Sequence, residues 1–306
     1  MIRFSNLAQL KRILIIPVLV FFVFTLSAQS VDKSGSLLWK ISGNGLTEPS
    51  YIFGTHHLFP VSFLDSVAGV KQAFASSRQM VGEVVMQDMT AIGLEMQKAG
   101  MMPQDSTWQM LLSENDHRFV DEQLTALLGV GLQALGVLKP FMVSMTYVVL
   151  LNQKIFPQAN PAEPMDLWFQ QQATGREIPV LGLETVQDQI NALTMGSLKR
   201  QAADLVCVMR NPDYAENAAR KLNRMYRNAD LSGMFEILRE KGPCPSSAEQ
   251  EYALNDARNK RWVEKLPAII ADKPSFIAVG ALHLPGEEGV LAGLQRAGFT
   301  VEAVRK

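Results

Sequence analysis

The same five-residue phrase, Gly-x-x-His-Leu, follows an apolar run near each end of this chain. It reads Gly-Thr-His-His-Leu at residues 54–58 and Gly-Ala-Leu-His-Leu at residues 280–284. The runs before the two copies, residues 51–53 and 276–279, are typical of buried strands. Two strand ends that present this phrase can bring two imidazoles to one edge of a sheet. An α/β fold commonly builds a reactive or metal-binding centre at such an edge.

The rest of the sequence predicts strands at both ends and helices between them. Short apolar runs predict strands over residues 36–41, 50–53, 78–85, 178–183, 275–279 and 299–304. Helical spacing predicts helices over residues 62–76, 108–113, 115–128, 140–153, 165–174, 187–240 and 248–270. We therefore expect an α/β (α+β) fold. Its central sheet is assembled from N- and C-terminal strands, with a large, mostly helical insertion at about residues 100–175.

The first 28 residues predict a signal peptide. Arg3, Lys11 and Arg12 precede an apolar stretch over residues 13–24, and small residues ending at Ala28 offer a cleavage site. The stretch is shorter than the ~20 residues that a membrane span needs. We expect export to the periplasm or the medium, with an uncleaved N-terminal anchor as the alternative.

The remaining residues, 29–306, predict a globular protein without a membrane span. The formal net charge of −1 becomes −4 once the three basic residues of the signal peptide are removed. A nucleic-acid partner calls for a basic face, which this balance does not favour. The two cysteines, Cys207 and Cys244, are an even pair in an exported chain, so a disulfide and two free thiols both remain open.

The histidines of the repeated phrase are the first candidates for chemistry. His57 and His283 are the fourth residues of their phrases, and neutral imidazole is both a metal ligand and a general base. His56 and His57 should point opposite ways on an extended segment. We favour His57 because it matches the spacing of His283. The fourth histidine, His117, lies in a charged stretch and is expected at the surface.

Two glutamates and an arginine could complete the site. Glu83 and Glu184 each stand at or near the end of an apolar strand, where burying a carboxylate is costly unless a metal or a cation compensates. A glutamate at a strand end can also cap a helix or lie in water. Two His and two Glu could form a divalent-metal site or a metal-free acid–base pair, and the sequence leaves both open. Arg258 is a candidate for stabilising an oxyanion, or it is an exposed arginine on a charged helix.

These phrases resemble the TraB/GumN family, which includes the Tiki proteases. The resemblance runs from about residue 37 to residue 304. It rests on five phrases in the family's order: residues 51–58, 82–84, 179–185, Arg258-Asn259 ahead of Trp262, and 279–291. It implies that residues 29–306 form one TraB/GumN-like domain.

The resemblance also implies roles for the candidate residues. Tiki proteases are metal-dependent and use two Gly-x-x-His motifs with an acidic residue, so His57, Glu83 and His283 are expected to hold manganese or cobalt. Glu184 and Arg258 match further family signatures and are expected to be catalytic. Gly54, Thr55, His56, Gly280 and Asn259 are expected to support the site. His56 stands where the family usually has an apolar residue.

The leading hypothesis is an exported metal-dependent hydrolase that acts on a peptide or a small molecule. The ion would activate water, Glu184 would be the base or a further ligand, and Arg258 would stabilise the oxyanion. One alternative is a non-catalytic protein that binds peptide, metal or haem in the same pocket. The other is a metal-free, esterase-like hydrolase with one histidine as base, since the family also resembles the erythromycin-esterase and ChaN-like group.

Overall fold

The computed structural model describes residues 35–157 and 163–305. The predicted signal peptide, residues 1–28, lies outside the described residues. A six-stranded sheet runs in the order β4-β3-β5-β2-β1-β6. Its strands are β1 (Leu38–Ser42), β2 (Ser50–Thr55), β3 (Gln79–Gly82), β4 (Val180–Gly182), β5 (Ser275–Gly280) and β6 (Thr300–Ala303).

The sheet is mixed, and its centre joins the two ends of the chain. Strand β1 pairs antiparallel with β2 and β6, whereas β2, β3 and β4 belong to a parallel set around β5. Every residue of β5 except its last is buried, which fits a continuous apolar sequence with both faces of the strand covered. The predicted α/β (α+β) fold, with its sheet built from N- and C-terminal strands, is confirmed.

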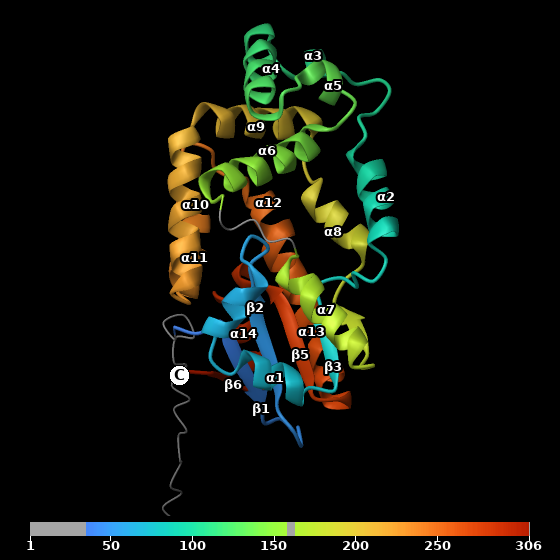
Figure 1. The fold of residues 1–306 in the computed structure, drawn as a ribbon, viewed down its shortest axis with the longest axis vertical. Coiled ribbons are helices and arrows are strands. Elements are labelled where there is room, and N and C mark those ends of the chain that lie inside the picture. The colour runs from blue at the N-terminus through green and yellow to red at the C-terminus, as the bar shows by residue number, and fades with distance from the viewer. Residues whose placement is uncertain (1–34, 158–162, 306) are drawn as a thin grey trace, which may run out of the picture. The chain divides into compact units, whose positions relative to one another are not determined.

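Helices surround this sheet and also form a separate layer beside it (Figure 1). Two lie between β2 and β3: η2 (Val61–Ser66) and α1 (Val70–Ser76). Between β3 and β4 are α2 (Met89–Gly100), α3 (Trp108–Leu111), α4 (Glu114–Leu128), α5 (Leu132–Leu135), α6 (Pro140–Ile155) and α7 (Met165–Gly175). Between β4 and β5 are α8 (Val186–Leu193), α9 (Leu198–Arg210), α10 (Pro212–Arg227), α11 (Leu231–Arg239), α12 (Ala248–Glu251), the π turn η3 (Tyr252–Asp256) and α13 (Ala257–Asp272). The 3-10 turn η4 (Ala281–His283) and α14 (Val290–Arg296) follow β5.

One core packs on the sheet. Phe74 of α1 and Phe169 of α7 lie 5.3 Å apart between ring centroids, and Phe169 lies 4.7 Å from Phe276 of β5. These contacts place α1 and α7 on one face of the sheet. Helices α13 and α14 pack together on the other face, where Trp262 and Leu266 are fully buried.

A second core lies within the helical layer. It contains Trp108, Leu124 and Tyr147, which precede β4, together with Leu205 and Met209 of α9, which follows it. The layer is therefore built from two separate segments of chain. Helix α6 packs against α9 across this join.

Several predicted elements have different bounds in the structure. The helix predicted over 62–76 is divided into η2 and α1 because Gly69, between them, has a φ of +74°, a conformation that favours glycine. The helices predicted over 187–240 are α8 to α11. Strand β3 ends at Gly82, so Glu83 lies just past the strand. Helix α2 was not predicted from the sequence.

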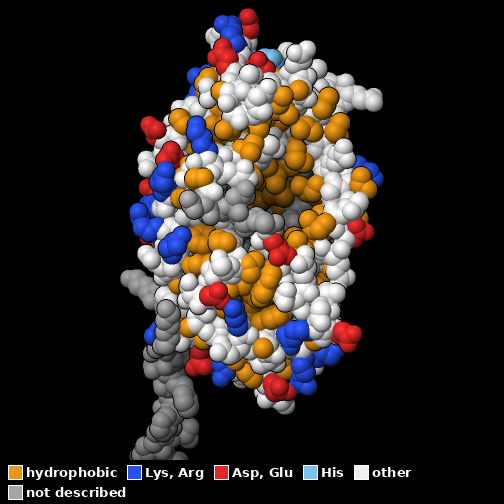
Figure 2. All heavy atoms as spheres, in the orientation of Figure 1, with side chains coloured by type: hydrophobic (Ala, Val, Ile, Leu, Met, Phe, Trp, Pro, Cys, Tyr) orange, Lys and Arg blue, Asp and Glu red, His pale blue; other side chains and the backbone are white. Residues whose placement is uncertain are grey.

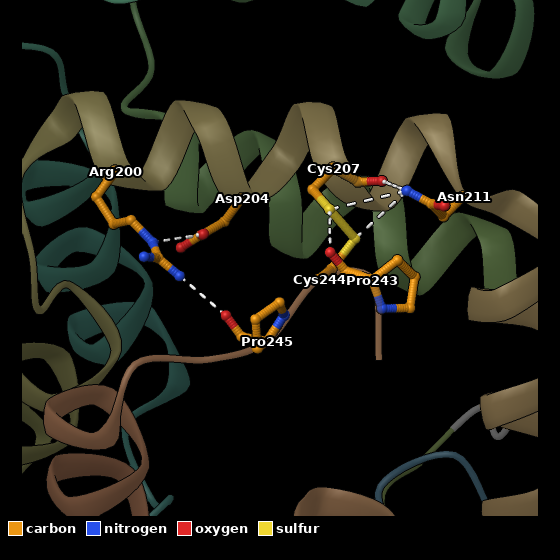
Figure 3. Close-up of a disulfide and its surroundings, with 7 residues drawn as sticks. All are labelled: Arg200, Asp204, Cys207, Asn211, Pro243, Cys244 and Pro245. Carbon is orange, nitrogen blue, oxygen red and sulfur yellow. Dashed lines mark hydrogen bonds and ion pairs between the residues drawn. A yellow bond between two sulfur atoms is a disulfide. The ribbon is translucent and has the colours of Figure 1, made fainter. Parts of the chain in front are cut away.

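The two cysteines form a disulfide, an outcome that the sequence left open. Cys207 of α9 is bonded to Cys244, which lies in the segment after α11, and their Cα atoms are 5.7 Å apart. Figure 3 shows a second link beside it, in which Arg200 of α9 donates to the carbonyl of Pro245 at 2.9 Å. These links fasten the segment after α11 to α9.

In the described part of the chain, no helix combines the length and the apolar character that a membrane crossing requires.

Candidate functional site

The two copies of the repeated phrase lie side by side. Strands β2 and β5 are parallel neighbours, and Thr55 is opposite Gly280. A Cβ at Gly54 would come within 3.0 Å of Ala281 Cα, so glycine is what lets the two segments approach. This register brings the histidines that follow the two strands to the same edge of the sheet, as predicted from the sequence.

His283 is buried and held as a neutral base. Its Nδ1 lies 2.7 Å from Asn259 Oδ1, and the amide of Asn259 is fixed because its Nδ2 donates to the carbonyl of Glu288 at 3.0 Å. Nδ1 therefore carries the hydrogen, and Nε2 accepts from Arg258 Nη1 at 3.0 Å. Burial lowers the pKa of His283 to about 4, so the ring is neutral at pH 7.

His57 has the opposite protonation state. Its Nδ1 lies 2.9 Å from Asp166 Oδ2 in an ion pair, and Thr55 Oγ1 donates to Asp166 Oδ1 at 2.7 Å. The hydrogen bond to Asp166 is the largest cause that raises the pKa of His57 to about 9, and the charge of Glu83 adds to it. The His57 side chain is 66% exposed. Because Nδ1 faces Asp166, Nε2 is the nitrogen left for the pocket that His57 lines.

His56 also lines the pocket, but its partners differ from those of His57. Its Nδ1 accepts from the backbone N–H of Leu58 at 3.2 Å, and its ring packs against Tyr226 and Phe59 with centroids 5.0 Å away. Burial lowers the pKa of His56 to about 4. His56 is thus a neutral ring in an aromatic wall, whereas His57 is the imidazolium paired with a carboxylate.

Arg258 lies at the centre of the predicted residues. It is 6% exposed, so the interpretation of an exposed arginine is wrong. Its Nη2 donates to Glu83 Oε2 at 2.6 Å and to Glu184 Oε1 at 2.5 Å, and its Nε donates to Glu184 Oε1 at 3.0 Å. The π turn η3 directly precedes α13, which bears Arg258, and such turns are common at functional sites.

The two glutamates occupy different depths. Glu83 lines the pocket, and its Oε1 accepts from the backbone N–H of Gly280 at 2.8 Å. Burial alone would raise the pKa of Glu83, but the charge of Arg258 and the hydrogen bond from the Gly280 N–H bring it below its usual range. Glu184 is buried beneath Arg258, and among the described residues it is not part of the pocket lining.

His57, Glu83, Arg258 and His283 form the floor of a pocket of about 560 Å³. Figure 2 shows a hollow whose visible wall is largely hydrophobic, in the region that Figure 1 places between the helical layer and the sheet. The wall comes from α2, α6, α8, α10, α11 and η3. Reactive side chains below apolar walls are the usual arrangement of a small-molecule site.

As arranged, the residues do not fit the divalent ion that the resemblance implies at His57, Glu83 and His283. Glu83 and His283 both contact the guanidinium of Arg258, so a cation of the protein's own already lies between them. His57 is an imidazolium at neutral pH in this arrangement, so a metal at its Nε2 would first have to displace a proton. In residues 35–157 and 163–305, no three His, Cys, Asp or Glu side chains form a group that could hold a metal. Metal dependence therefore stays a prediction.

Two residues of the site, Asp166 and Gln189, were not predicted from the sequence. Asp166 is in the first turn of α7, where a carboxylate is stabilised by the helix N-terminus, and this common pattern does not distinguish it from a structural residue. Gln189 of α8 donates to Glu83 Oε2 at 3.1 Å. Only the parallel pairing of β3 with β4 brings α8 near Glu83, and the sequence gives no signal for it.

Comparison with known proteins gives one match. The model of the TraB/PrgY/gumN family matches residues 37–303. No curated protein and no solved structure matches the chain.

Proposed function

The chain belongs to the TraB/PrgY/gumN family, and we propose that it is a hydrolase that adds water to an ester or peptide carbonyl. The observation that carries this proposal is the opposite protonation of two histidines on one pocket. The pKa of His283 is lowered to about 4, and that of His57 is raised to about 9. Two titratable groups whose environments separate their pKa values in this way are typically a base and an acid.

In the proposed reaction, the neutral Nε2 of His283 takes a proton from water as the water oxygen attacks the carbonyl carbon. Arg258 Nη1 donates to this nitrogen in the free protein, so water must first replace that bond. The released guanidinium N–H then donates to the developing oxyanion. The bond to the leaving group breaks, and His57 donates the proton that the leaving group needs.

The other residues hold this arrangement. Asp166 keeps His57 protonated, and Asn259 fixes the tautomer of His283. Glu184 is a positioning residue, since both of its carboxylate oxygens contact Arg258 Nε. In this proposal neither Glu184 nor Glu83 is the general base, because both are engaged by a cation.

Chelation and two substitutions test the proposal. We expect hydrolysis of p-nitrophenyl esters to survive exhaustive treatment with a chelator. His57→Ala and His283→Ala should each lower kcat/KM by about 10²–10⁴-fold. His117→Ala, which changes the histidine that does not line this pocket, is the matched control and should retain activity.

Other results would favour the alternatives. Loss of activity on chelation, restored by Mn²⁺ or Co²⁺, would support the metal-dependent peptidase. Full activity in both histidine variants would exclude the proposed mechanism. Tight ligand binding without cleavage of any ester or peptide would favour a binding protein.

We also propose that the protein works outside the cytoplasm. The Cys207–Cys244 disulfide supports this proposal, because such bonds persist in oxidising compartments. Cell fractionation with thiol labelling tests it: the exported fraction should contain the protein with no free thiol.

A further inference from the structure

Apart from His56, the polar side chains of the pocket are concentrated at its floor. Among the described lining residues these include His57, Glu83, Gln189, Arg258 and His283. Most of them are already paired with one another, as when Gln189 donates to Glu83. The floor therefore suits one polar group of a ligand, the group that reacts.

The walls above this floor are largely apolar, and His56 among its aromatic neighbours is the main exception. They include Ile92 and Met96 of α2, Met145 of α6, Leu193 of α8 and Leu222 of α10. Because these residues lie within helices, most of their backbone N–H and C=O groups are bonded inside the helix. The walls thus offer few hydrogen-bond partners to a ligand.

This distribution separates two kinds of substrate. An extended peptide carries an N–H and a C=O on each residue, and each group buried here without a partner would weaken binding by about tenfold. An alkyl chain leaves no such group unpaired. Its burial against apolar side chains is favourable along its whole length.

The methionines of the wall favour a flexible chain over a rigid ring. Met96, Met145 and Met234 line the pocket from three different helices. Their unbranched side chains adapt to ligands of irregular shape.

We propose that the pocket takes a single unbranched acyl chain, with the carbonyl at the histidine floor, and that the substrates are esters of medium- or long-chain carboxylic acids. This inference rests on the proposed hydrolase function. Water adds to the acyl carbon and the bond from that carbon to the alkoxy oxygen breaks. The products are the carboxylic acid and an alcohol, which takes the proton.

A homologous series of substrates tests the inference. With p-nitrophenyl esters of straight-chain acids from two to ten carbons, below micelle-forming concentrations, kcat/KM should rise by up to about fourfold per methylene. The rise should flatten when the chain fills the pocket. A value that is constant or falls along the series would overturn the proposal.

A binding series separates this inference from the catalytic proposal. Straight-chain methyl ketones from five to eleven carbons cannot be hydrolysed, and calorimetry should give a dissociation constant that falls with each methylene. If the ketones follow this trend while no ester is cleaved, the proposed function fails and the acyl-chain pocket stands. If acetyl-Leu-Leu-Leu-amide binds more tightly than every ketone, the acyl-chain pocket is wrong.

Matched substitutions test where the acyl chain of the substrate binds. Met145 is 39% exposed and lines the pocket, so Met145→Trp should fold and fill part of the space. It should lower kcat/KM for the ten-carbon ester by at least tenfold, and by a much larger factor than for the two-carbon ester. Met110 of α3 is 67% exposed and lies outside the pocket lining. Met110→Trp should therefore leave kcat/KM unchanged for both the ten-carbon and the two-carbon ester.

Met96→Trp is a second filling variant on another helix. If Met145→Trp and Met96→Trp both fold and leave kcat/KM unchanged along the ester series, the acyl chain does not bind in this pocket and the proposal is overturned.

Discussion

At the scale of single residues, two histidines in one pocket differ because their buried partners differ. His283 has an amide and a guanidinium as partners, and both are satisfied by a neutral ring. His57 has the carboxylate of Asp166, which favours the imidazolium. The same side chain is thereby given two roles.

The pH dependence of hydrolysis follows from these partners. As the pH falls through about 4, His283 gains a proton and can no longer act as a base. As the pH rises through about 9, His57 loses the proton that it donates. We expect kcat/KM to be flat between these limits and to fall on both sides. A profile with a single limb near pH 6.5 would show that the pKa of neither histidine is shifted.

Asp166→Asn tests the partner of His57. Without the carboxylate, the pKa of His57 should drop, so the alkaline limb of the profile should move to lower pH while the acid limb stays near its original position. The control is Asp65→Asn, since Asp65 is 64% exposed and pairs with Lys71 on the surface. A profile unchanged by Asp166→Asn would remove Asp166 from the proposed mechanism.

Much of the site was predictable at this scale, and its charge state was not. The spacing of the repeated phrase predicted His57 and His283, which line one pocket. The ends of apolar strands predicted Glu83 and Glu184. Asp166 has no comparable signal. The protonation of His57 depends on its contact with Asp166. His57 follows β2 and Asp166 lies in α7, so the two residues are 109 positions apart in the sequence (166 − 57).

At the scale of elements, the strands were predicted better than the helices. A buried central strand such as β5 must be apolar at consecutive positions, which is a strong signal. Helix α2 is largely exposed and contains Gly93, so its sequence shows only a weak apolar face. The π turn η3, which directly precedes α13 and Arg258, cannot be predicted from apolar spacing.

Removing the disulfide tests how the segment after α11 is held. Cys207→Ala with Cys244→Ala should lower the free energy of unfolding by about 2–4 kcal/mol, because the bond closes a loop across 37 positions. Urea denaturation measures the change. Reductant should destabilise the native protein by a similar amount and leave the double variant unaffected. Equal midpoints for both proteins without reductant would contradict this expectation.

At the scale of the whole molecule, the pocket exists because helices from both sides of β4 join into one layer. Tyr147 of α6 and Leu205 of α9 share its core. The sequence predicted helices in both segments but carried no signal that they would pack together. Contacts between distant helices depend on complementary surfaces, which periodicity does not reveal.

The pairing of β2 with β5 also sets the point at which a newly made chain can complete the histidine pocket. Ser50 Oγ accepts from the N–H of Ser275, a partner 225 positions further along the chain. During translation the first histidine phrase leaves the ribosome long before the second one exists. An incomplete product lacks β5 and His283, so it cannot assemble the floor of the pocket. Cleavage between α13 and β5 would likewise separate the two halves of the floor while leaving most of the helices in one fragment.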